Sequence, residues 1–269
     1  MTKGRSLKAY AIGYLIFLYA PIVLLPMFAF NDSKIIAFPL SGFTTTWFSE
    51  MWNDSQMWNA LRNSLTISGT TAVLATTFGI FAARASTRFR FPGKGPAMGL
   101  IMLPLVLPEM IVAMSLLVVL LAIGVPLSIF TVILGHTLIC TPFAVAILTS
   151  AFQSLDTSLE EAAYDLGETP LSTFRLIILP LVMPGIISSL LICFTISLDE
   201  FIIAYFLAGA DTVLSSYIYS QFRFPARVPA MLALGTILVL VSIVLLTIAE
   251  FFRRRGIAKT GGKDTGGFL

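Results

Sequence analysis

The chain has 269 residues and a formal net charge of +3, and 57% of its residues are hydrophobic whereas only 12% are charged. A soluble domain is typically about a quarter charged, so this composition and a mean hydropathy of +0.92 exclude an ordinary soluble protein and predict an integral membrane protein. Its apolar runs are about 20 residues long and do not alternate, which predicts an all-α membrane protein rather than a β-barrel.

Windows of spanning length follow one another along the chain and predict one transmembrane domain over residues 1–269. They fall at about 9–30, 60–83, 97–121, 126–150, 177–208 and 228–252. The first window is too long for the apolar part of a secretory signal, and no small-residue cleavage site follows it, so we expect an uncleaved helix. The fifth window is long enough to include a broken or tilted beginning.

Lysine and arginine residues gather in three regions of the chain. They are Lys3, Arg5 and Lys8 before the first window, Arg84, Arg88, Arg90 and Lys94 in the second connection, and Arg253, Arg254, Arg255, Lys259 and Lys263 after the last window. Basic residues concentrate in short cytoplasmic loops, so both termini are expected to be cytoplasmic, an arrangement that six crossings satisfy. Segment 31–58 then lies outside, and the connection 151–176 lies in the cytoplasm.

The outer segment 31–58 contains Trp47, Trp52 and Trp58, which are all the tryptophans of the chain. One interpretation is an interfacial helix anchored by an aromatic belt. The other is a docking surface for an external partner, and the sequence does not choose between them.

Other residues within the windows are interpreted as structural. Small side chains recur along one face of the second window, at Ser68, Ala72, Ala75, Gly79 and Ala83. Such a face lets another helix backbone approach closely. His136 is expected to form a hydrogen bond between helices, and the thiols Cys140 and Cys193 indicate neither a disulfide framework nor a metal site.

Carboxylates are dense in the connection 151–176. Asp156, Glu160, Glu161, Asp165 and Glu168 lie within thirteen residues. Thr157 and Ser158 each precede a glutamate by three residues, the spacing of a capping box, which predicts that a helix begins here. Gly167 stands where a left-handed C-terminal cap is expected, and Thr169 and Pro170 fit the N-cap and first position of a second helix.

The predicted unit is a helix, a glycine turn and a second helix, with an acidic rim and a short apolar stripe. The stripe consists of Leu159, Ala162, Ala163 and Leu166. Such a surface suits insertion into a groove on another protein. Composition alone favours a different interpretation, a solvated acidic loop that aids solubility.

The order and spacing of residues in this connection favour the docking surface over the solvated loop. Glu161-Ala162-Ala163, three residues, Gly167, nine residues, Ile177, one residue and then Leu179-Pro180 resembles the cytoplasmic signature of permease subunits of binding-protein-dependent ABC importers. The stretches "AFNDSK", "NSLTIS" and "SLDEFIIAYF" look like the spermidine/putrescine permease branch of that family.

The resemblance implies a type I ABC importer permease fold with six transmembrane helices and a cytoplasmic coupling helix that docks into a cleft on an ATP-hydrolysing subunit. The residues that it assigns to coupling are Glu160, Glu161, Ala162, Ala163, Asp165 and Gly167. It also implies two ATPase subunits, a second homologous permease and a periplasmic or surface substrate-binding protein, in the inner membrane of a bacterium. Membrane lipid surrounds such a chain, and no nucleic-acid partner is expected.

ATP is expected on the partner subunit, because the chain has no phosphate loop of the GxxxxGK[ST] type. No recognisable set of catalytic residues is present, so we expect no enzymatic activity. The chain is expected to hold no cofactor or metal of its own.

Three carboxylates lie inside apolar windows: Glu109, Asp199 and Glu200. Each costs several kcal/mol in lipid unless it faces the interior of the bundle, so each is a candidate for the substrate pathway. On straight helices, Glu109 lies roughly 18 Å from the cytoplasmic end of its window, and the Asp199–Glu200 pair lies roughly 22 Å beyond Pro184.

The carboxylates predict a cationic cargo. Asp199 is favoured over Glu200 for the pathway, because neighbours on a helix point about 100° apart and the more outward charge can reach the headgroup region. Tyr205 can add cation–π attraction. We therefore predict transport of a small organic cation, putrescine or spermidine; the alternatives are the same kind of permease for an anion, metal or sugar, and a proton-coupled secondary transporter.

Overall fold

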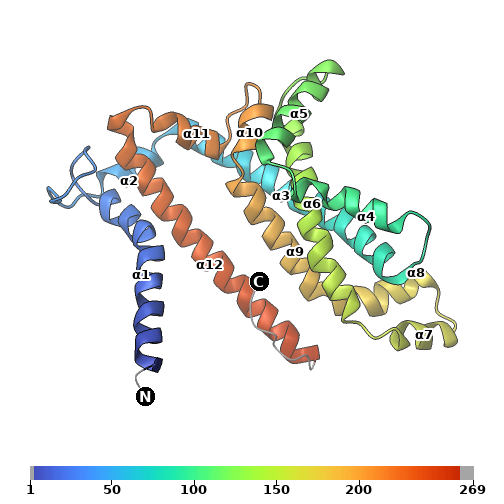
Figure 1. Ribbon diagram of the computed structural model, residues 1–269. Helices are drawn as coiled ribbons and strands as arrows, with labels where there is room; N and C mark the ends of the chain where they lie inside the picture. Colours follow the sequence, from blue (N-terminus) through green and yellow to red (C-terminus); the bar gives the residue numbers. More distant parts are fainter. Residues whose placement is uncertain (1–2, 261–269) are drawn as a thin grey trace. The chain divides into compact units, whose positions relative to one another are not determined.

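A computed structural model describes residues 3–260, and within that range the chain is helical apart from loops and an isolated β-bridge between Asn31 and Phe43 (Figure 1). The α-helices in chain order are α1 (Lys3–Ala29), α2 (Thr46–Trp52), α3 (Ser55–Arg88), α4 (Lys94–Met102), α5 (Glu109–Ala122), α6 (Ile129–Gln153), α7 (Ser158–Asp165), α8 (Pro170–Thr173), α9 (Leu179–Asp199), α10 (Ile202–Leu207), α11 (Leu214–Gln221) and α12 (Val228–Thr260). The 3-10 turns are Leu103–Leu105 and Pro225–Arg227, and Phe174–Ile178 is a π-helical turn. Lys263, one of the residues used to predict the orientation, lies outside the described range.

The described residues include five helices that are long and apolar enough to cross a membrane, or six if the bent pair α4 and α5 is one span. The prediction of an all-α membrane protein is therefore confirmed. The third window, 97–121, is not a straight helix, because residues 94–105 and 109–122 meet at 104°. Pro108 supplies the physical reason: it has no N–H to continue a helix, and its ψ of 129° is extended.

The fifth window is also interrupted. A π-helical turn precedes α9, and α9 ends at Asp199, where Glu200 takes an extended ψ of 122° before α10 begins. The predicted irregular beginning is therefore present, and the window also has a second break near its end, which was not predicted. Asp199 and Glu200 consequently do not follow one another on a continuous helix, so the predicted separation of about 100° does not describe them.

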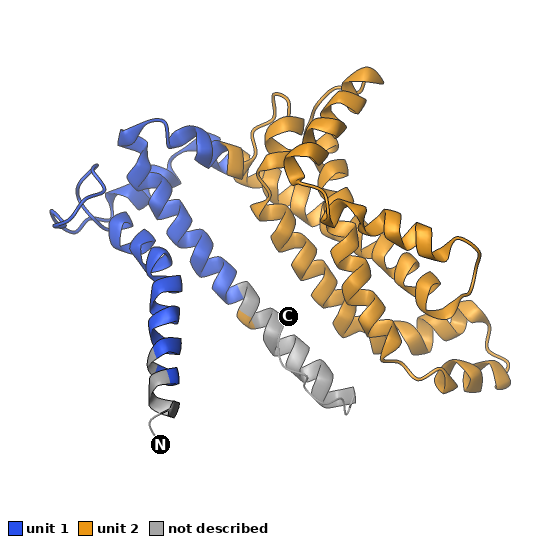
Figure 2. Cartoon of the chain, in the orientation of Figure 1, with its two compact units in different colours: residues 1–58, 217–245 blue, residues 59–216, 246–269 orange. Residues whose placement is uncertain are grey.

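The chain divides into two compact units, coloured separately in Figure 2. The first comprises residues 1–58 and 217–245, and its core includes Phe28, Trp47 and Leu232. Trp47 Nε1 donates a hydrogen bond to the Asn31 carbonyl over 2.7 Å. Trp47 is therefore a core residue of the segment 31–58, whereas the Trp52 and Trp58 rings pack edge to face and are exposed.

The second unit, residues 59–216 and 246–269, contains α5, α6, α9 and α10 and most of α3. Its helices approach closely, because a Cβ atom built on Gly79 of α3 would lie 2.7 Å from Ala144 Cβ of α6. The predicted small-residue face of the second window therefore packs against a helix backbone. His136 Nδ1 of α6 lies 2.7 Å from Ser197 Oγ of α9, which confirms the predicted hydrogen bond between helices.

Candidate functional site

The connection 151–176 folds as the predicted helix, glycine turn and helix. Gly167 follows α7 with a φ of +87°, a left-handed conformation that glycine adopts without steric cost. Thr169 Oγ1 accepts a hydrogen bond from the Ser172 N–H over 3.3 Å and caps α8, whose first residue is Pro170. The turn chemistry predicted from the sequence is therefore confirmed.

The beginning of α7 differs from the prediction of a capping box. Thr157 has a helical φ and ψ, and its side chain forms no capping hydrogen bond. Asp156 Oδ1 instead accepts a hydrogen bond from the Ser158 N–H over 2.9 Å. That hydrogen bond lowers the pKa of Asp156, since it favours the charged carboxylate. The box at Thr157 does not form, and Glu160, its proposed partner, is bound elsewhere. Ser158, the first residue of the other proposed box, is already inside α7.

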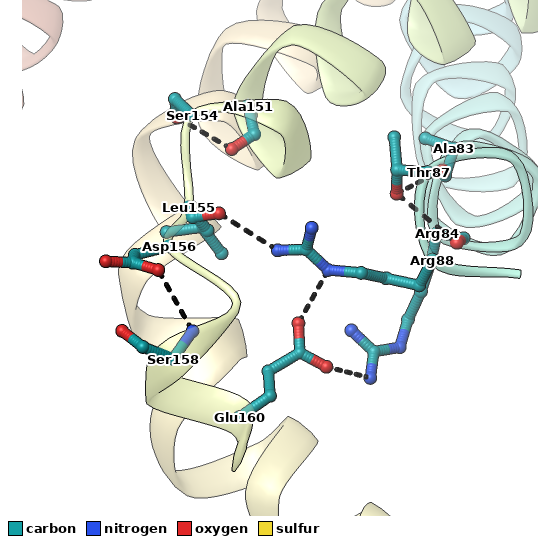
Figure 3. A network of polar contacts seen from close by, with 10 residues as sticks. All are labelled: Ala83, Arg84, Thr87, Arg88, Ala151, Ser154, Leu155, Asp156, Ser158 and Glu160. Atoms are coloured by element: carbon teal, nitrogen blue, oxygen red, sulfur yellow. Dashed lines mark hydrogen bonds and ion pairs between the residues drawn. The ribbon is translucent and has the colours of Figure 1, made fainter. Parts of the chain in front are cut away.

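Glu160 forms ion pairs with two arginines at the end of α3, as Figure 3 shows. Its Oε1 accepts from Arg88 Nε over 2.7 Å, and its Oε2 accepts from Arg84 Nη2 over 3.1 Å. Arg88 Nη2 also donates to the Leu155 carbonyl over 3.1 Å. The prediction of an exposed acidic rim is therefore wrong for Glu160, which is buried.

The other carboxylates of the segment remain at the surface. Glu161, Asp165 and Glu168 are exposed, and Glu168 accepts a hydrogen bond from Ser172 Oγ. The apolar stripe is divided in the same way, because Ala163 is buried whereas Leu166 is 86% exposed. Leu159 and Ala162 are exposed as well. One face of α7 thus packs on the chain itself, and the opposite face presents carboxylates and apolar side chains.

The roles of Arg84 and Arg88 are not predictable from the sequence, where they indicate only a side of the membrane. The chain separates them from Glu160 by 76 and 72 residues. Their spacing of four residues places both on one face of a helix. Only the packing of α3 against the connection brings that face to Glu160.

The structure places the predicted pathway residue Glu109 at the first position of α5, immediately after the break. It is exposed, and none of the ion pairs among the described residues involves it. The depth of about 18 Å assumed a straight helix, so the bend of 104° invalidates that value.

Asp199 and Glu200 have different surroundings. Asp199, the last residue of α9, is exposed, whereas Glu200 is buried and its Oε1 accepts from the Ile203 N–H over 2.6 Å. Ser215 Oγ donates to the Glu200 carbonyl over 3.1 Å. Glu200 therefore caps α10. Tyr205 of α10 is half exposed, and its ring contacts the rings of Phe201 and Phe206.

Solved structures that resemble this fold include ABC transporters. The chain matches a bacterial ABC transporter involved in the import of the acidic polysaccharide alginate with a TM-score of 0.72, 23% identity and coverage of 94% of this chain and 95% of that one. It matches the methionine ABC transporter MetNI with a TM-score of 0.62 and 14% identity, over 77% of this chain and 98% of that one. At these identities the likeness shows the fold, which is the predicted one.

Curated relatives match over most of the chain. The putrescine transport system permease protein PotI of Escherichia coli (strain K12) is 39% identical over 230 residues, covering 82% of this chain and 81% of the relative. The spermidine/putrescine transport system permease protein PotC of the same strain is 32% identical over 253 residues, covering 93% and 95%. Residues 75–256 match the family described as binding-protein-dependent transport system inner membrane component. The chain belongs to this family of inner membrane transport components.

Proposed function

We propose that this chain is the membrane-spanning subunit of an ATP-driven importer and that it forms the pathway for a small organic cation, putrescine or spermidine. The observation that carries the proposal is the 39% identity to a putrescine permease across 82% of the chain. The fold by itself does not indicate the charge of the cargo, because a transporter of the same fold is involved in importing an acidic polysaccharide.

The intramembrane carboxylates support a cationic cargo. Glu109 and Asp199 each lie at the end of a helix beside a break, and both are exposed without an ion-pair partner among the described residues. An unpaired carboxylate in a spanning segment is stable only where it reaches water or a cation. Irregular backbone within a spanning segment likewise requires a cavity or protein neighbours. We assign both residues to the pathway, and Tyr205 to its aromatic wall.

The assembly that we propose has two ATPase subunits, a second homologous permease and a substrate-binding protein. ATP is bound by the ATPase subunits, and the exposed face of α7, with Glu161, Ala162, Asp165 and the turn at Gly167, docks on one of them. Membership in a binding-protein-dependent family supports this composition. Both termini are cytoplasmic in this arrangement, and the segment 31–58 lies outside.

The test replaces each pathway carboxylate by its neutral near-isostere, Asp199→Asn or Glu109→Gln, in the complete complex. We expect uptake of labelled putrescine to fall at least about tenfold, since a charge-assisted contact is worth about 1.5–3 kcal/mol and 1.4 kcal/mol is a factor of ten. Basal ATP hydrolysis and the amount of assembled complex should not change. Glu50→Gln, an exposed carboxylate of the segment 31–58, is the matched control.

The alternatives give different results in the same assay. A permease for an anion or a sugar would tolerate the loss of negative charge. A proton-coupled carrier would transport without ATP or a binding protein. Wild-type uptake of putrescine and spermidine in both variants would remove the electrostatic support for a cationic cargo.

A further inference from the structure

One carboxylate joins the helix α7 to the end of the spanning helix α3. Glu160 accepts from Arg84 and Arg88 through its two separate oxygens, so its position is defined by both arginines at once (Figure 3). The three side chains are between 11% and 17% exposed. Removing one partner of an ion pair shielded from water in this way is costly, because the remaining charge stays buried without compensation.

The same arginines also contact the segments on both sides of α7. Arg88 donates to the carbonyl of Leu155, which follows α6. The Arg84 guanidinium lies 5.2 Å from the centre of the Phe174 ring, where the chain turns into the fifth span. The end of α3 therefore contacts the chain before, within and after the first helix of the connection.

Helix α3 is packed tightly enough to transmit a displacement. Ala83, which immediately precedes Arg84, is fully buried in a cluster with Leu148 and Phe152 of α6 and Val182 of α9. Thr76 Oγ1 lies 3.0 Å from the hydroxyl of a serine on α9, another contact across the bundle. Close-packed helices move as rigid bodies rather than deform, so a force on the end of α3 reaches α6 and α9.

We propose that Glu160 is a positioning residue which, together with Arg84 and Arg88, forms a clamp that fixes α7 on α3. A movement that an ATPase subunit imposes on α7 then moves α3, and with it the spanning helices. The transmission of movement from an ATPase subunit rests on the proposed function. The clamp itself does not, because its contacts lie within one chain. It assigns adjacent glutamates to different tasks: Glu160 holds the helix in place, and the exposed Glu161 faces the partner.

The charges indicate why a carboxylate is needed at position 160. Two cations share this one anion, and Arg84 Nη1 is buried without a hydrogen-bond partner among the described residues. A neutral side chain there would leave two guanidinium groups facing each other in a poorly solvated site. Helix α7 would then open from α3 more often.

The test compares Glu160→Gln, Arg88→Gln and the double variant in the purified complex, reconstituted with its ATPase subunits and binding protein and supplied with putrescine. Arg90→Gln is the matched control, because it removes a basic charge from the same loop at an exposed position. We measure amide hydrogen exchange over residues 158–166, and putrescine transported per ATP hydrolysed. Each clamp variant should raise the exchange and lower the transport per ATP about tenfold. The double variant should cost less than the sum of the two single variants, since both remove the contact between Arg88 and Glu160.

The outcomes separate the clamp from a merely structural role and from the proposed function. Wild-type exchange in Glu160→Gln would show that no clamp holds α7. A fall in the amount of assembled complex with unchanged transport per ATP, or faster exchange with unchanged transport per ATP, would overturn the positioning role. If the wild-type complex takes up no putrescine, the proposed function fails, and the exchange measurement still decides the clamp.

Discussion

At the scale of single residues, the surroundings of a carboxylate determine what it does. Glu160 and Glu161 are adjacent on α7, yet Glu160 is buried between two arginines and Glu161 is exposed. Asp199 and Glu200 repeat this contrast, because Glu200 caps α10 whereas Asp199 remains exposed. In each pair one carboxylate supports the fold, and the other is available to a partner or a cargo.

Asp54 is a further carboxylate that supports the fold, at the N-terminal end of α3. Its Oδ1 accepts from the N–H groups of Gln56 and Met57 over 2.9 and 3.2 Å. Its Oδ2 accepts from Tyr217 Oη over 2.7 Å and lies 3.5 Å from Arg227 Nη1. Burial raises the pKa of Asp54, but the hydrogen bond from Tyr217, the two backbone hydrogen bonds and the charge of Arg227 outweigh it and lower the pKa.

The lowered pKa of Asp54 predicts a pH-dependent contribution to stability. The ionised carboxylate stabilises the fold above its ordinary pKa of 3.8, and this stabilisation is lost as the pH falls through the lower folded-state pKa. At neutral pH, Asp54→Asn should therefore lower the stability by about 1 kcal/mol, because asparagine still caps the helix but carries no charge. Thermal unfolding from neutral to acidic pH is the measurement. If the difference in stability between Asp54→Asn and the wild type is the same at every pH, the ionised Asp54 carboxylate does not make this contribution. Glu50→Gln is the control.

At the scale of elements, breaks and turns position the candidate residues. Glu109 begins a helix after Pro108, and Asp199 ends one before Glu200. Both predicted pathway carboxylates thus lie where the helical backbone stops, and backbone groups there must find partners other than helical ones. The turn at Gly167 likewise positions the residues of the connection 151–176, because it sets the angle between α7 and α8.

Gly167 permits a test of the turn that separates backbone conformation from packing. A Cβ atom at Gly167 would meet nothing within 4 Å in this chain, so within the chain a substitution there acts through its φ of +87°. Gly167→Val should strain the turn by about 1–2 kcal/mol, whereas Gly167→Asn should be tolerated, because asparagine adopts the left-handed conformation more readily. We expect Gly167→Val to insert in the membrane but to lose substrate-stimulated ATP hydrolysis and uptake. Intact hydrolysis and uptake in Gly167→Val would show that this turn does not transmit the state of the ATPase.

At the scale of the whole molecule, the proposed orientation depends on the basic residues and on the number of crossings. The five spans, with the bent pair α4 and α5 as a sixth, give the even number that two cytoplasmic termini require. Arg84 and Arg88 then serve two purposes. They favour the cytoplasmic side during insertion, and in the folded chain they hold Glu160.

Cysteine accessibility tests the orientation, because Cys140 and Cys193 are buried and give a low background. Thr45→Cys and Pro92→Cys place thiols at exposed positions in the segment 31–58 and in the connection between α3 and α4. A membrane-impermeant reagent should label position 45 in cells with a permeable outer layer, and position 92 only after the membrane is opened. Labelling of position 92 from the outside would refute the arrangement. Position 263, in the C-terminal segment that is expected in the cytoplasm, lies outside the described residues.

Features that depend on local chemistry were predictable from the sequence. Apolar length predicts the spans, and the left-handed turn at Gly167 and the cap at Thr169 follow from the preferences of those residues at those positions. The motif around Glu161 indicated the family, which the match to residues 75–256 confirms. These features require only neighbours a few residues away, so the order of residues is sufficient to predict them.

Contacts between segments that are distant in the chain, and the energies that depend on them, could not be predicted from the order of residues. Glu160 was expected to complete a cap within its own helix, but two arginines more than seventy residues away bind it more strongly, since their charges are buried with it. A prediction from spacing also could not choose between a kink and a full break at Pro108, because neighbouring helices decide whether the freed backbone groups find partners. Burial and partner choice are properties of the packed chain, and they separate residues that the sequence presents as equivalent.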